Sequence, residues 1–577
     1  MGAPLHALGG GSTTTRSAGA LAVAPVFAVG AFALPIAAGV AGTLAPAFGF
    51  LPAIGGHALT LDPWRELVRW PGFVSSVTLT IATGVAATLL SLIVALAFAA
   101  WACARPWGAR ASAWIAPVLA TPHSAFAIGL AFVIAPSGWI VRAVSPWLTG
   151  FDVPPDVATV GHPSGAALVL ALMMKEVPYL VLMIAGASAQ VPVRESLAIA
   201  RSLGYRAADA WFATVLPRIW RQIRLPVCAV LAFSLSVVDV ALILGPSHPP
   251  TLAVQAIRWF ADPDVRSWFP AAAAATLQLA IVVAAIALLL GVERVAARLG
   301  PARIEHGRRD GAGGTVAAAG ATFLALLVAL AGASIAGMAL WSFASQWRYP
   351  DAWPSGLSTE GWMRRLDGLA SPFATTLAVG AVAVAVSLAL VLACLEFEQR
   401  RAKRGPPPGL ALLYVPLLVP QVAFLFGAQV LLVRTGWDGA LVAVVWAHVI
   451  FVLPYLFLSL ADPWRALDPR YARAAASLGA GPWRVFWRVK LPILAKPVAI
   501  ACAVAFAVSV GQYLPTLFAG NGRVPTLTTE AVTLSSGADR RVIGAYAVLQ
   551  ALLPLAAYLA AASLPERHRP RRRGSRS

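Results

Sequence analysis

The sequence has little charge. Only 12% of its 577 residues are Asp, Glu, Lys or Arg, whereas 59% are hydrophobic. Soluble domains carry about 25% charged residues, because most of their surface faces water. The chain also lacks the polar linkers that would divide a sequence of this length into several soluble domains. These shortages exclude a soluble multidomain enzyme and indicate an integral membrane protein.

Patterns that carry chemistry are also missing. The four cysteines, Cys103, Cys228, Cys394 and Cys502, lie in or beside apolar runs and form no CxxC pair, so neither a disulfide framework nor a metal site is expected. No lysine follows a glycine, as the lysine of a nucleotide-binding Walker A loop must. HExxH and nucleophile-elbow patterns are absent as well. The sequence therefore predicts no catalytic residue and no cofactor, and any ATP hydrolysis must come from a separate subunit.

What the chain does have is a series of apolar runs, each roughly 20 residues long or more, the length that crosses about 30 Å of hydrocarbon. They predict an all-α membrane protein of about twelve transmembrane helices. The first run follows only Arg16 and is too long for a signal-peptide core, so we expect an uncleaved helix. The runs lie at about 20–46, 73–101, 112–135, 165–189, 225–247, 269–292, 315–342, 371–396, 408–433, 439–461, 497–519 and 542–563.

The formal charge of +20 comes from basic clusters between these runs and not from one basic face, so nucleic-acid binding is not expected. Contact with anionic membrane lipid and control of topology explain the clusters. If both termini lie in the cytoplasm, that side holds 31 of the 44 Lys and Arg residues and the other side holds 12, with Lys175 inside a run. The positive-inside rule therefore predicts a multi-pass inner (plasma) membrane protein with cytoplasmic termini.

The chain also repeats itself. A pattern from Pro122 to Trp139 recurs 298 residues later, and Leu203-Gly204 and Leu216-Pro217 recur 275 residues later. Each half holds six runs, so the halves should cross the membrane in the same direction as parallel repeats. The expected organisation is a cytoplasmic tail at 1–19, a first half at 20–300, a cytoplasmic linker at 301–314, a second half at 315–565 and a basic cytoplasmic tail at 566–577.

The longest loop on the basic side of each half carries a matched motif. Residues 198–204 read Ala-Ile-Ala-Arg-Ser-Leu-Gly, and Leu216-Pro217 follows after eleven residues. Residues 473–479 read Arg-Ala-Ala-Ala-Ser-Leu-Gly, and Leu491-Pro492 follows at the same spacing. Alanine favours helix, glycine allows a tight turn and proline ends a helix. The loops, about 194–218 and 469–493, are therefore predicted to form a helix, a turn, a second helix and a stop.

The predicted second helix has an apolar stripe in both loops. A single helix of this kind could lie in the membrane interface and contact no partner. Two copies with identical spacing, both on the basic side, favour a docking function instead. The stripes consist of Ala208, Trp211, Phe212, Val215 and Leu216 in the first loop, and Trp483, Phe486, Trp487 and Leu491 in the second.

These loops resemble the cytoplasmic signature loop of type I binding-protein-dependent ABC importer permeases. That loop has the form Glu-Ala-Ala, three residues, Gly, nine residues, Ile, one residue, Leu-Pro. Ala198 and Arg473 stand where the signature has Glu, and Thr214 and Val489 stand where it has Ile. The matching positions are Ala200, Gly204, Leu216 and Pro217 in the first loop, and Ala474, Ala475, Gly479, Leu491 and Pro492 in the second.

The resemblance covers nearly the whole chain, and the fusion of two halves is similar to ferric-iron, thiamine and related uncharacterised importers. It implies that each loop forms a coupling helix that docks in a groove of an ATPase subunit. The implied partners are two copies of a cytoplasmic ABC ATPase and a periplasmic or lipid-anchored solute-binding protein. Because the signature Glu is missing, the aromatic stripe is expected to supply most of the docking energy.

Charges within the membrane point to a second functional region. Lys175 and Glu176 lie midway through the fourth run, and Asp239 lies in the fifth. Such charges usually face a bundle interior or a watery cavity, so they either line a substrate pathway or form a structural pair, Lys175 with Glu176 or Asp239. Neighbouring helix positions point about 100° apart, so Lys175 and Glu176 should have different partners. The second half offers only Gln512 and Tyr513 at this depth, which predicts an asymmetric pathway.

The sequence leaves iron chelates, thiamine, polyamines, phosphonates and inorganic anions open as solutes. The main alternative function is an ion-coupled secondary transporter with two six-helix halves, whose central loop would be residues 293–314. That class gives no reason for two matched loops between the fourth and fifth runs of each half. A channel or a lipid-modifying enzyme fits less well still. The predicted function is therefore the permease subunit of an ATP-driven, binding-protein-dependent importer for a small solute.

Overall fold

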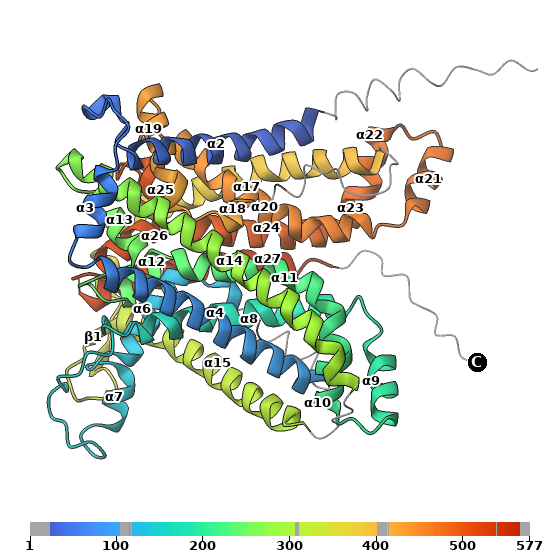
Figure 1. Cartoon of the computed structure of the whole chain (residues 1–577), viewed down its shortest axis with the longest axis horizontal. Helices are drawn as coiled ribbons and strands as arrows, with labels where there is room; N and C mark the ends of the chain where they lie inside the picture. The colour runs from blue at the N-terminus through green and yellow to red at the C-terminus, as the bar shows by residue number, and fades with distance from the viewer. Residues whose placement is uncertain are drawn as a thin grey trace, which may run out of the picture.

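The computed structural model describes residues 23–103, 105, 115, 118–305, 311–400, 412, 415–537 and 539–565, with backbone alone for 299–305. Within these residues the chain is almost entirely helical, and its long helices run side by side between two ends of the molecule (Figure 1). The predicted all-α membrane fold is confirmed. The expected tails at 1–19 and 566–577 and the middle of the expected linker lie outside the described residues.

The first half supplies six long helices and six short ones. The long helices are α2 (Val23–Ala47), α4 (Phe73–Cys103), α6 (His123–Ile134), α8 (Ala166–Ser188), α11 (Leu216–Ser236) and α14 (Trp268–Glu305) within the described ranges. The short helices are α3 (Asp62–Arg69), α7 (Trp139–Val144), α9 (Val193–Ser202), α10 (Ala207–Ala210), α12 (Asp239–Leu244) and α13 (Leu252–Phe260).

The second half repeats this order. Its long helices are α15 (Gly313–Phe343), α17 (Leu366–Arg400), α19 (Val422–Thr435), α20 (Leu441–Arg465), α24 (Ala495–Val510) and α27 (Arg540–Ala562). Its short helices are α16 (Glu360–Met363), α18 (Val415–Leu418), α21 (Pro469–Ser477), α22 (Pro482–Val485), α23 (Leu491–Ile493), α25 (Leu514–Gly520) and α26 (Leu527–Leu534). Between α15 and α16, strand β1 (Ala344–Gln346) pairs with β2 (Gly356–Leu357) in antiparallel orientation.

Each of the twelve expected runs contains a helix. Over the described parts of the chain, nine helical segments are long and apolar enough to cross a membrane, and the bent pair Pro482–Ile493 and Ala495–Val510 makes a tenth. Helices α11 and α19 complete the set: the first three turns of α11 carry Arg218, Arg221 and Arg224, and α19 has only 14 residues. The starts of the expected third and ninth runs, 112–117 and 408–414, lie mostly outside the described residues.

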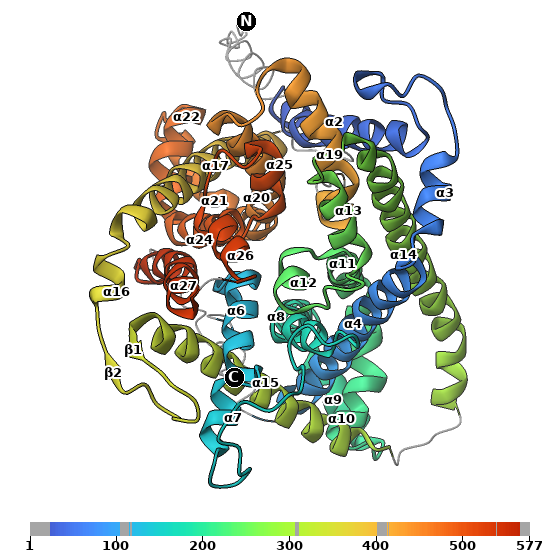
Figure 2. The same cartoon turned by 90° about the vertical axis from the view of Figure 1, so that its left-hand side faces the viewer.

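The first helix of each half packs against the third helix of the other half, α2 on α19 and α15 on α6 (Figure 2). A Cβ atom on Gly427 of α19 would lie 2.0 Å from the carbonyl oxygen of Gly39, and the Gly427 N–H donates to Thr43 Oγ1 at 3.2 Å. At the other contact, a Cβ atom on Gly129 would lie 2.6 Å from the Ser334 carbonyl oxygen. Gly129 and Gly427 are repeat partners, so the same small residue lets the helix backbones touch in both places and interlocks the halves.

One end of the first half carries an extra segment. The repeat offset falls from 298 residues at Trp139 to 276 at Pro178, because α7 and the loop that follows it have no counterpart between α19 and α20. This segment projects at the end of the molecule that also holds α3, α13 and the small sheet (Figure 1). The buried Arg142 of α7 donates to the carbonyl oxygen of Arg348 at 2.7 Å and so fixes the segment to the second half.

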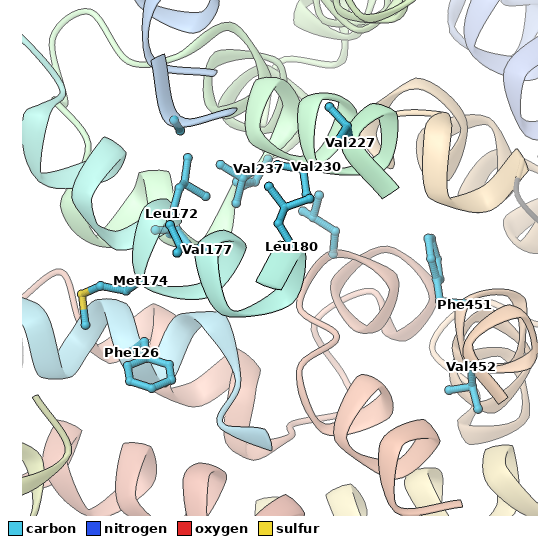
Figure 3. Packing of buried hydrophobic residues seen from close by; sticks show 14 of the residues in the cluster. Phe126, Leu172, Met174, Val177, Leu180, Val227, Val230, Val237, Phe451 and Val452 are labelled. Carbon is cyan, nitrogen blue, oxygen red and sulfur yellow. The ribbon is translucent and has the colours of Figure 1, made fainter. Parts of the chain in front are cut away.

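The apolar core continues across the two halves. Figure 3 shows Leu180 of α8 among the core side chains of the first half, with Phe451 and Val452 of α20 from the second. By the repeat, Phe451 and Val452 occupy the positions of Lys175 and Glu176. The second half therefore fills with apolar side chains the place where the first half carries charges.

Candidate coupling loops and membrane pathway

Both motif loops fold around their glycines as predicted, with a helix, a turn and a second helix. Helix α9 ends at Ser202, and Gly204 follows with φ of +91°. Helix α21 ends at Ser477, and Gly479 follows with φ of +78°. This left-handed conformation is open to glycine but strained for residues with a Cβ atom.

The two turns share one hydrogen-bond pattern. In the first, the N–H of Tyr205 donates to the carbonyl oxygen of Ala200 at 3.2 Å. In the second, Ala480 donates in the same way to Ala475 at 3.1 Å. Each glycine N–H also donates to the carbonyl oxygen three residues before it, at 3.0 Å. This is the Schellman cap, which fixes the spacing between the motif alanine and the glycine by backbone geometry.

Both loops lie at the same end of the molecule (Figure 1). Helices α9 and α10 of the first half and α21 and α22 of the second are there, and α2 begins and α27 ends at this end. Helices α3, α13 and α26 lie at the opposite end. The side on which the sequence places most basic residues is therefore one face of the fold, and the two loops share it.

The apolar stripes divide into buried and exposed parts. Trp211 and Phe486, which are repeat partners, are only 1% and 4% exposed and pack into the chain's own core. Trp483 and Trp487 are 51% and 59% exposed, whereas Phe212 is half-buried. The sequence treated each stripe as one docking anchor. In this structure Trp211 instead packs the first loop onto the first half, and Phe486 packs the second loop onto the second half. The exposed rings, Trp483 and Trp487, both belong to the second loop.

The leucine before each glycine is exposed as well. Leu203 directly follows α9 in one loop and Leu478 directly follows α21 in the other, and both side chains are exposed. In the first loop, Ile199 of α9 adds to this apolar surface. Clustered exposed apolar side chains outside the membrane-spanning helices mark contact sites. The loops therefore present apolar surface at the same motif position.

The prediction that the motif prolines end a helix is wrong for Pro217, whereas the helical segment that contains Pro492 ends one residue later, at Ile493. Pro217 lies in the first turn of α11, directly after the π-helical segment Trp211–Val215. Pro492 lies in α23, directly after the π-helical segment Phe486–Lys490. Proline is tolerated in a first turn, and the wider π turn before it accommodates the ring. The first loop runs unbroken into α11, whereas the second bends by 75° at Leu494.

Buried charges attach the second loop to its half. Lys490 Nζ lies 2.7 Å from Glu396 Oε2, and Arg400 Nε lies 2.8 Å from Glu396 Oε1. Lys490 also donates to Gln399 Oε1 at 2.7 Å. The guanidinium carbon of Arg400 lies 5.2 Å from the ring centroid of Trp483, a cation–π contact. An exposed aromatic ring of the loop is thereby connected to a buried ion cluster.

The first loop has an apolar attachment at the same place. Helices α4 and α17 correspond in the repeat, with Thr80 at the position of Thr376. The Thr80 hydroxyl accepts the backbone N–H of the first residue of α13 at 2.9 Å, and the Thr376 hydroxyl accepts that of the first residue of α26 at the same distance. With this alignment, Val215 and Ala100 take the positions of the buried lysine and glutamate, and both are buried. The first loop has one polar tie of its own: Asp209 Oδ1 accepts from the backbone N–H of Gly313, the first residue of α15, at 3.0 Å.

Deeper in the membrane, Lys175 and Glu176 have different partners, as expected. Lys175 Nζ donates to the carbonyl oxygens of Val118 at 3.1 Å, Leu119 at 3.0 Å and Thr121. It thus satisfies the carbonyl groups that are left open where the chain turns into α6. Within the described residues Lys175 forms no salt bridge, so neither structural pair considered for it is present.

Glu176 lies near the start of α6 and has a partner of its own. Its Oε1 lies 3.6 Å from Nε2 of His123, the first residue of α6, and it lies within electrostatic range of Tyr455 on α20. Asp239 begins α12 and lies within electrostatic range of His123 and of Tyr513. The fold therefore brings Glu176 and Asp239 of the first half within electrostatic range of Tyr455 and Tyr513 of the second.

Gln512 and Tyr513 occupy a break between α24 and α25, which matches the break at residues 237–238 between α11 and α12. Gln512 is buried, and neither its amide nitrogen nor its amide oxygen has a hydrogen-bond partner among the described residues. Gly511 lies against the start of α6, since a Cβ atom there would be 3.7 Å from Pro122 Cβ. The break in the second half therefore faces the histidine end of α6.

Sequence reasoning missed His123, Glu396 and Lys490. A signal for the last two existed, because the repeat sets Lys490 against Val215 and Glu396 against an alanine. Two opposite charges that replace apolar residues in only one half are candidates for a buried pair. His123 gave a weaker signal, as the residue after the repeated Pro122.

Two interlocked six-helix halves, with paired glycine-capped loops at one end and a polar junction between the halves, define a solute permease. Residues 408–573 match the family model for the binding-protein-dependent transport system inner membrane component. The inner membrane ABC transporter permease protein YnjC of Escherichia coli is 32% identical over 498 residues, 86% of this chain and 89% of that protein. The chain belongs to the permeases of binding-protein-dependent ABC transporters.

Shorter relatives match part of the chain. The molybdenum transport system permease protein ModB of Mycobacterium tuberculosis is 34% identical over 215 residues, 35% of this chain and 78% of that protein. The spermidine/putrescine transport system permease protein PotC of Escherichia coli is 24% identical over 115 residues, 20% of this chain and 44% of that protein. The chain is thus a multi-pass inner-membrane transport subunit with two fused halves, and the import function is confirmed over the ion-coupled alternative. Its family implies an ATPase and a solute-binding protein as partners.

Proposed function

We propose that this chain forms the whole translocation pore and that two copies of a cytoplasmic ABC ATPase dock on its two loops. A periplasmic or lipid-anchored solute-binding protein delivers the solute at the opposite end. The carrying observation is the pair of identical Schellman turns, at Gly204 and Gly479, which present helices at one end of the molecule. One docking loop for each ATPase copy makes the stoichiometry two to one.

The exposed apolar residues beside the turns supply the docking surface. Leu203 and Ile199 serve the first ATPase copy, and Leu478, Trp483 and Trp487 serve the second. Large aromatic residues in the centre of an interface usually dominate its binding energy. We therefore assign the stronger contact to the second loop. The missing signature Glu removes one charge from each contact but leaves this apolar surface intact.

Each loop connects to the polar junction through one helix. The first loop runs into α11, which ends at the break at residues 237–238 and is followed by Asp239. The second loop bends into α24, which ends at the break that holds Gln512 and Tyr513. Closure of an ATPase dimer would move the loops, and these two helices would carry the movement to the pathway residues. This gives Asp239, Gln512 and Tyr513, with Glu176, a role in the pathway, whereas Lys175 serves the fold.

Co-purification tests the proposal. The full chain expressed with its cognate ATPase should yield a complex with two ATPase copies for each chain by native mass spectrometry, and the chain alone should neither bind nor hydrolyse ATP. A complex with one ATPase copy, or ATP hydrolysis by the purified chain, would contradict the proposal.

Cysteine labelling tests the orientation, with both termini and both loops in the cytoplasm. In a background without the four native cysteines, a membrane-impermeant reagent applied to intact cells should modify a cysteine at position 156, in the segment after α7. It should leave cysteines at positions 206 and 484 unmodified until the membrane is broken. Labelling of the loop positions in intact cells would invert the topology.

The named relatives have different solutes, so their names do not identify the solute of this chain. One is a molybdenum permease and another a spermidine/putrescine permease, and fused architecture also resembles the ferric-iron and thiamine importers. The solute class therefore has to come from the residues of this chain.

A further inference from the structure

We propose that the pathway of this permease is built for an organic cation, which the carboxylates of Glu176 and Asp239 receive where the two halves meet. The proposal rests on the proposed function, because it takes the junction of the halves as the route of the solute. It goes further in naming the class of solute and the side chains that select it.

The first observation is that Glu176 is buried and incompletely paired. Its side chain is 8% exposed, and the nearest basic group in the described part of the chain is His123 Nε2 at 3.6 Å, beyond hydrogen-bond distance. No hydrogen bond to the Glu176 carboxylate is formed by any described residue. A buried carboxylate is costly unless a cation or several donors satisfy it. A cationic solute would supply the positive charge and the hydrogen-bond donors that the Glu176 carboxylate lacks.

The second observation is the charge balance. Lys175 lies within electrostatic range of Glu176, but three backbone carbonyl groups just before α6 hold its ammonium, which forms no salt bridge in the described part of the chain. Asp239, the first residue of α12, adds a second carboxyl group within electrostatic range of His123. The junction thus holds two carboxyl groups and one lysine, and backbone carbonyl groups already engage that lysine. The junction therefore attracts cations and repels anions.

The third observation comes from the repeat. Val452 and Leu514 occupy the positions of Glu176 and Asp239 in the second half, and both are buried in the core there (Figure 3 labels Val452). The same backbone thus folds around apolar residues at these two positions. The second half thus folds without carboxylates at these positions, and this favours a role in binding over a role in structure for Glu176 and Asp239.

The second half supplies groups that suit an organic cation. Tyr455 and Tyr513 lie within electrostatic range of Glu176 and Asp239 respectively. Their rings can take part in cation–π contacts and their hydroxyl oxygens can accept hydrogen bonds from an ammonium group. Gln512, beside Tyr513, has a buried amide with no hydrogen-bond partner in the described residues, and its oxygen is a further acceptor. Two carboxyl groups together with two aromatic rings are groups that suit an amine or a quaternary ammonium ion.

Direct binding to the purified full chain tests the proposal without the ATPase. Thermal unfolding is measured at constant ionic strength with three cations, spermidine, thiamine and tetraethylammonium, and three anions, molybdate, sulfate and citrate, each at millimolar concentration. At least one cation should raise the melting temperature by about 1–3 °C, and the anions should not. Glu176→Gln and Asp239→Asn should each remove most of the shift. Glu360→Gln, which changes an exposed carboxylate at the end of the molecule away from the loops, should keep it.

If Glu176→Gln fails to accumulate, Glu176→Val replaces it, because the second half folds with valine at this position. A shift with the anions, no shift with any of the cations, or a cation shift that survives in both carboxylate variants would overturn the proposal. Mass spectrometry of the solute carried by the cognate binding protein is the second readout, and an anion there would also overturn it. These results leave the ATPase co-purification untouched, so the solute class and the proposed function fail separately.

Discussion

The two coupling loops share a turn but differ in how they are attached. In both, a Schellman cap sets the first helix and a π-helical turn precedes the motif proline. In the first half, Val215 and Ala100 lie in the apolar core, whereas at these positions in the second half Lys490 and Glu396, with Arg400, form an ion cluster. Backbone geometry was thus kept through the duplication while the attachment changed its chemistry. Truncating an apolar side chain destabilises the protein in proportion to the apolar surface removed. Removing one member of a buried ion cluster is more destabilising, because it leaves the other charge buried without a partner.

The loops also differ in how they enter the membrane. The first continues without a break into α11, so a displacement of α9 is passed directly to the helix that ends at the break before Asp239. The second bends by 75° at Leu494 before α24 begins, and its exposed surface includes Trp483 and Trp487. We infer that the first loop moves as one body with its helix, and that the second combines a larger docking surface with a hinge.

Removing one member of the ion cluster should give the largest effect. Glu396→Ala leaves Lys490 buried without its carboxylate, and loss of one partner of a buried pair typically costs about 3–5 kcal/mol. We expect low accumulation in the membrane and a lower melting temperature for the purified chain. The matched change in the first half, Ala100→Ser, adds one hydroxyl that can bond to its own helix and should cost far less. Equal melting temperatures for Glu396→Ala and the parent chain would show that the cluster contributes nothing.

Replacing the whole ion cluster by the apolar residues of the first half should restore the stability that Glu396→Ala loses. The triple variant Glu396→Ala, Arg400→Ala, Lys490→Val gives the second half the residues that stand at these positions in the first. Apolar replacement of a whole buried ion pair is often neutral or stabilising. The triple variant should therefore melt well above Glu396→Ala alone. Its ATPase binding should stay weaker, because Arg400 no longer supports the Trp483 ring.

The buried and exposed rings should separate folding from docking. Trp211→Ala removes a fully buried side chain and should cost about 3–5 kcal/mol of stability. Trp483→Ala changes an exposed ring and should alter stability by only about 0.5 kcal/mol, while it weakens the ATPase complex. Melting temperature and ATPase titration of both variants check this. If Trp211→Ala accumulates normally and Trp483→Ala binds the ATPase as tightly as the parent, the division of the stripe is wrong.

Sequence alone predicted the parts of these loops that depend on local rules. The glycines, the helices before them and the equivalence of the loops follow from turn chemistry and from the repeat, and all are present in the structure. The burial of Trp211 and Phe486 could not be read from the pattern, since an apolar stripe does not say whether it faces the chain's own core or a partner. Pro217 was misread because no sequence rule predicts the π turn that precedes it and lets the helix continue.

Long-range pairing was the other limit. Lys490 and Glu396 are 94 residues apart, and their contact depends on how α17 meets the second loop. In the membrane, the sequence located Lys175, Glu176 and Asp239 and gave Lys175 and Glu176 separate partners. It could not show that backbone carbonyl groups hold Lys175, because that depends on the turn before α6. The sequence also could not predict that α2 and α15 each pack against the other half. Gly129 and Gly427 allow these close helix contacts, but their role is visible only once the partner helix is placed.

The turns themselves should give an intermediate effect. Valine at Gly204 or Gly479 must adopt a left-handed backbone, which costs about 1–2 kcal/mol and more for a β-branched residue. No described atom lies within 4 Å of a Cβ atom placed on Gly479, so the effect there comes from backbone strain and not from a clash. The helices should still insert, while ATPase binding and uptake fall, with Gly479→Val at least as damaging as Gly204→Val. Gly479→Asn tolerates this backbone better and is the control. Normal ATPase binding and uptake in both valine variants would return the loops to a purely interfacial role.

The smallest effect should come from the tie between the first loop and the second half. Asp209→Ala removes the acceptor for the Gly313 N–H, and a hydrogen bond of this kind contributes about 0.5–1.5 kcal/mol. The second loop has Arg484 at the matching position, so the tie belongs to the first loop alone. Asp209→Asn keeps an acceptor oxygen and should behave like the parent chain. The expected result for Asp209→Ala is normal accumulation, normal ATPase binding and a small loss of uptake, because α10 would no longer be held to the start of α15 when the loop moves. Uptake equal to that of the parent would show that the first loop transmits its movement through α11 alone.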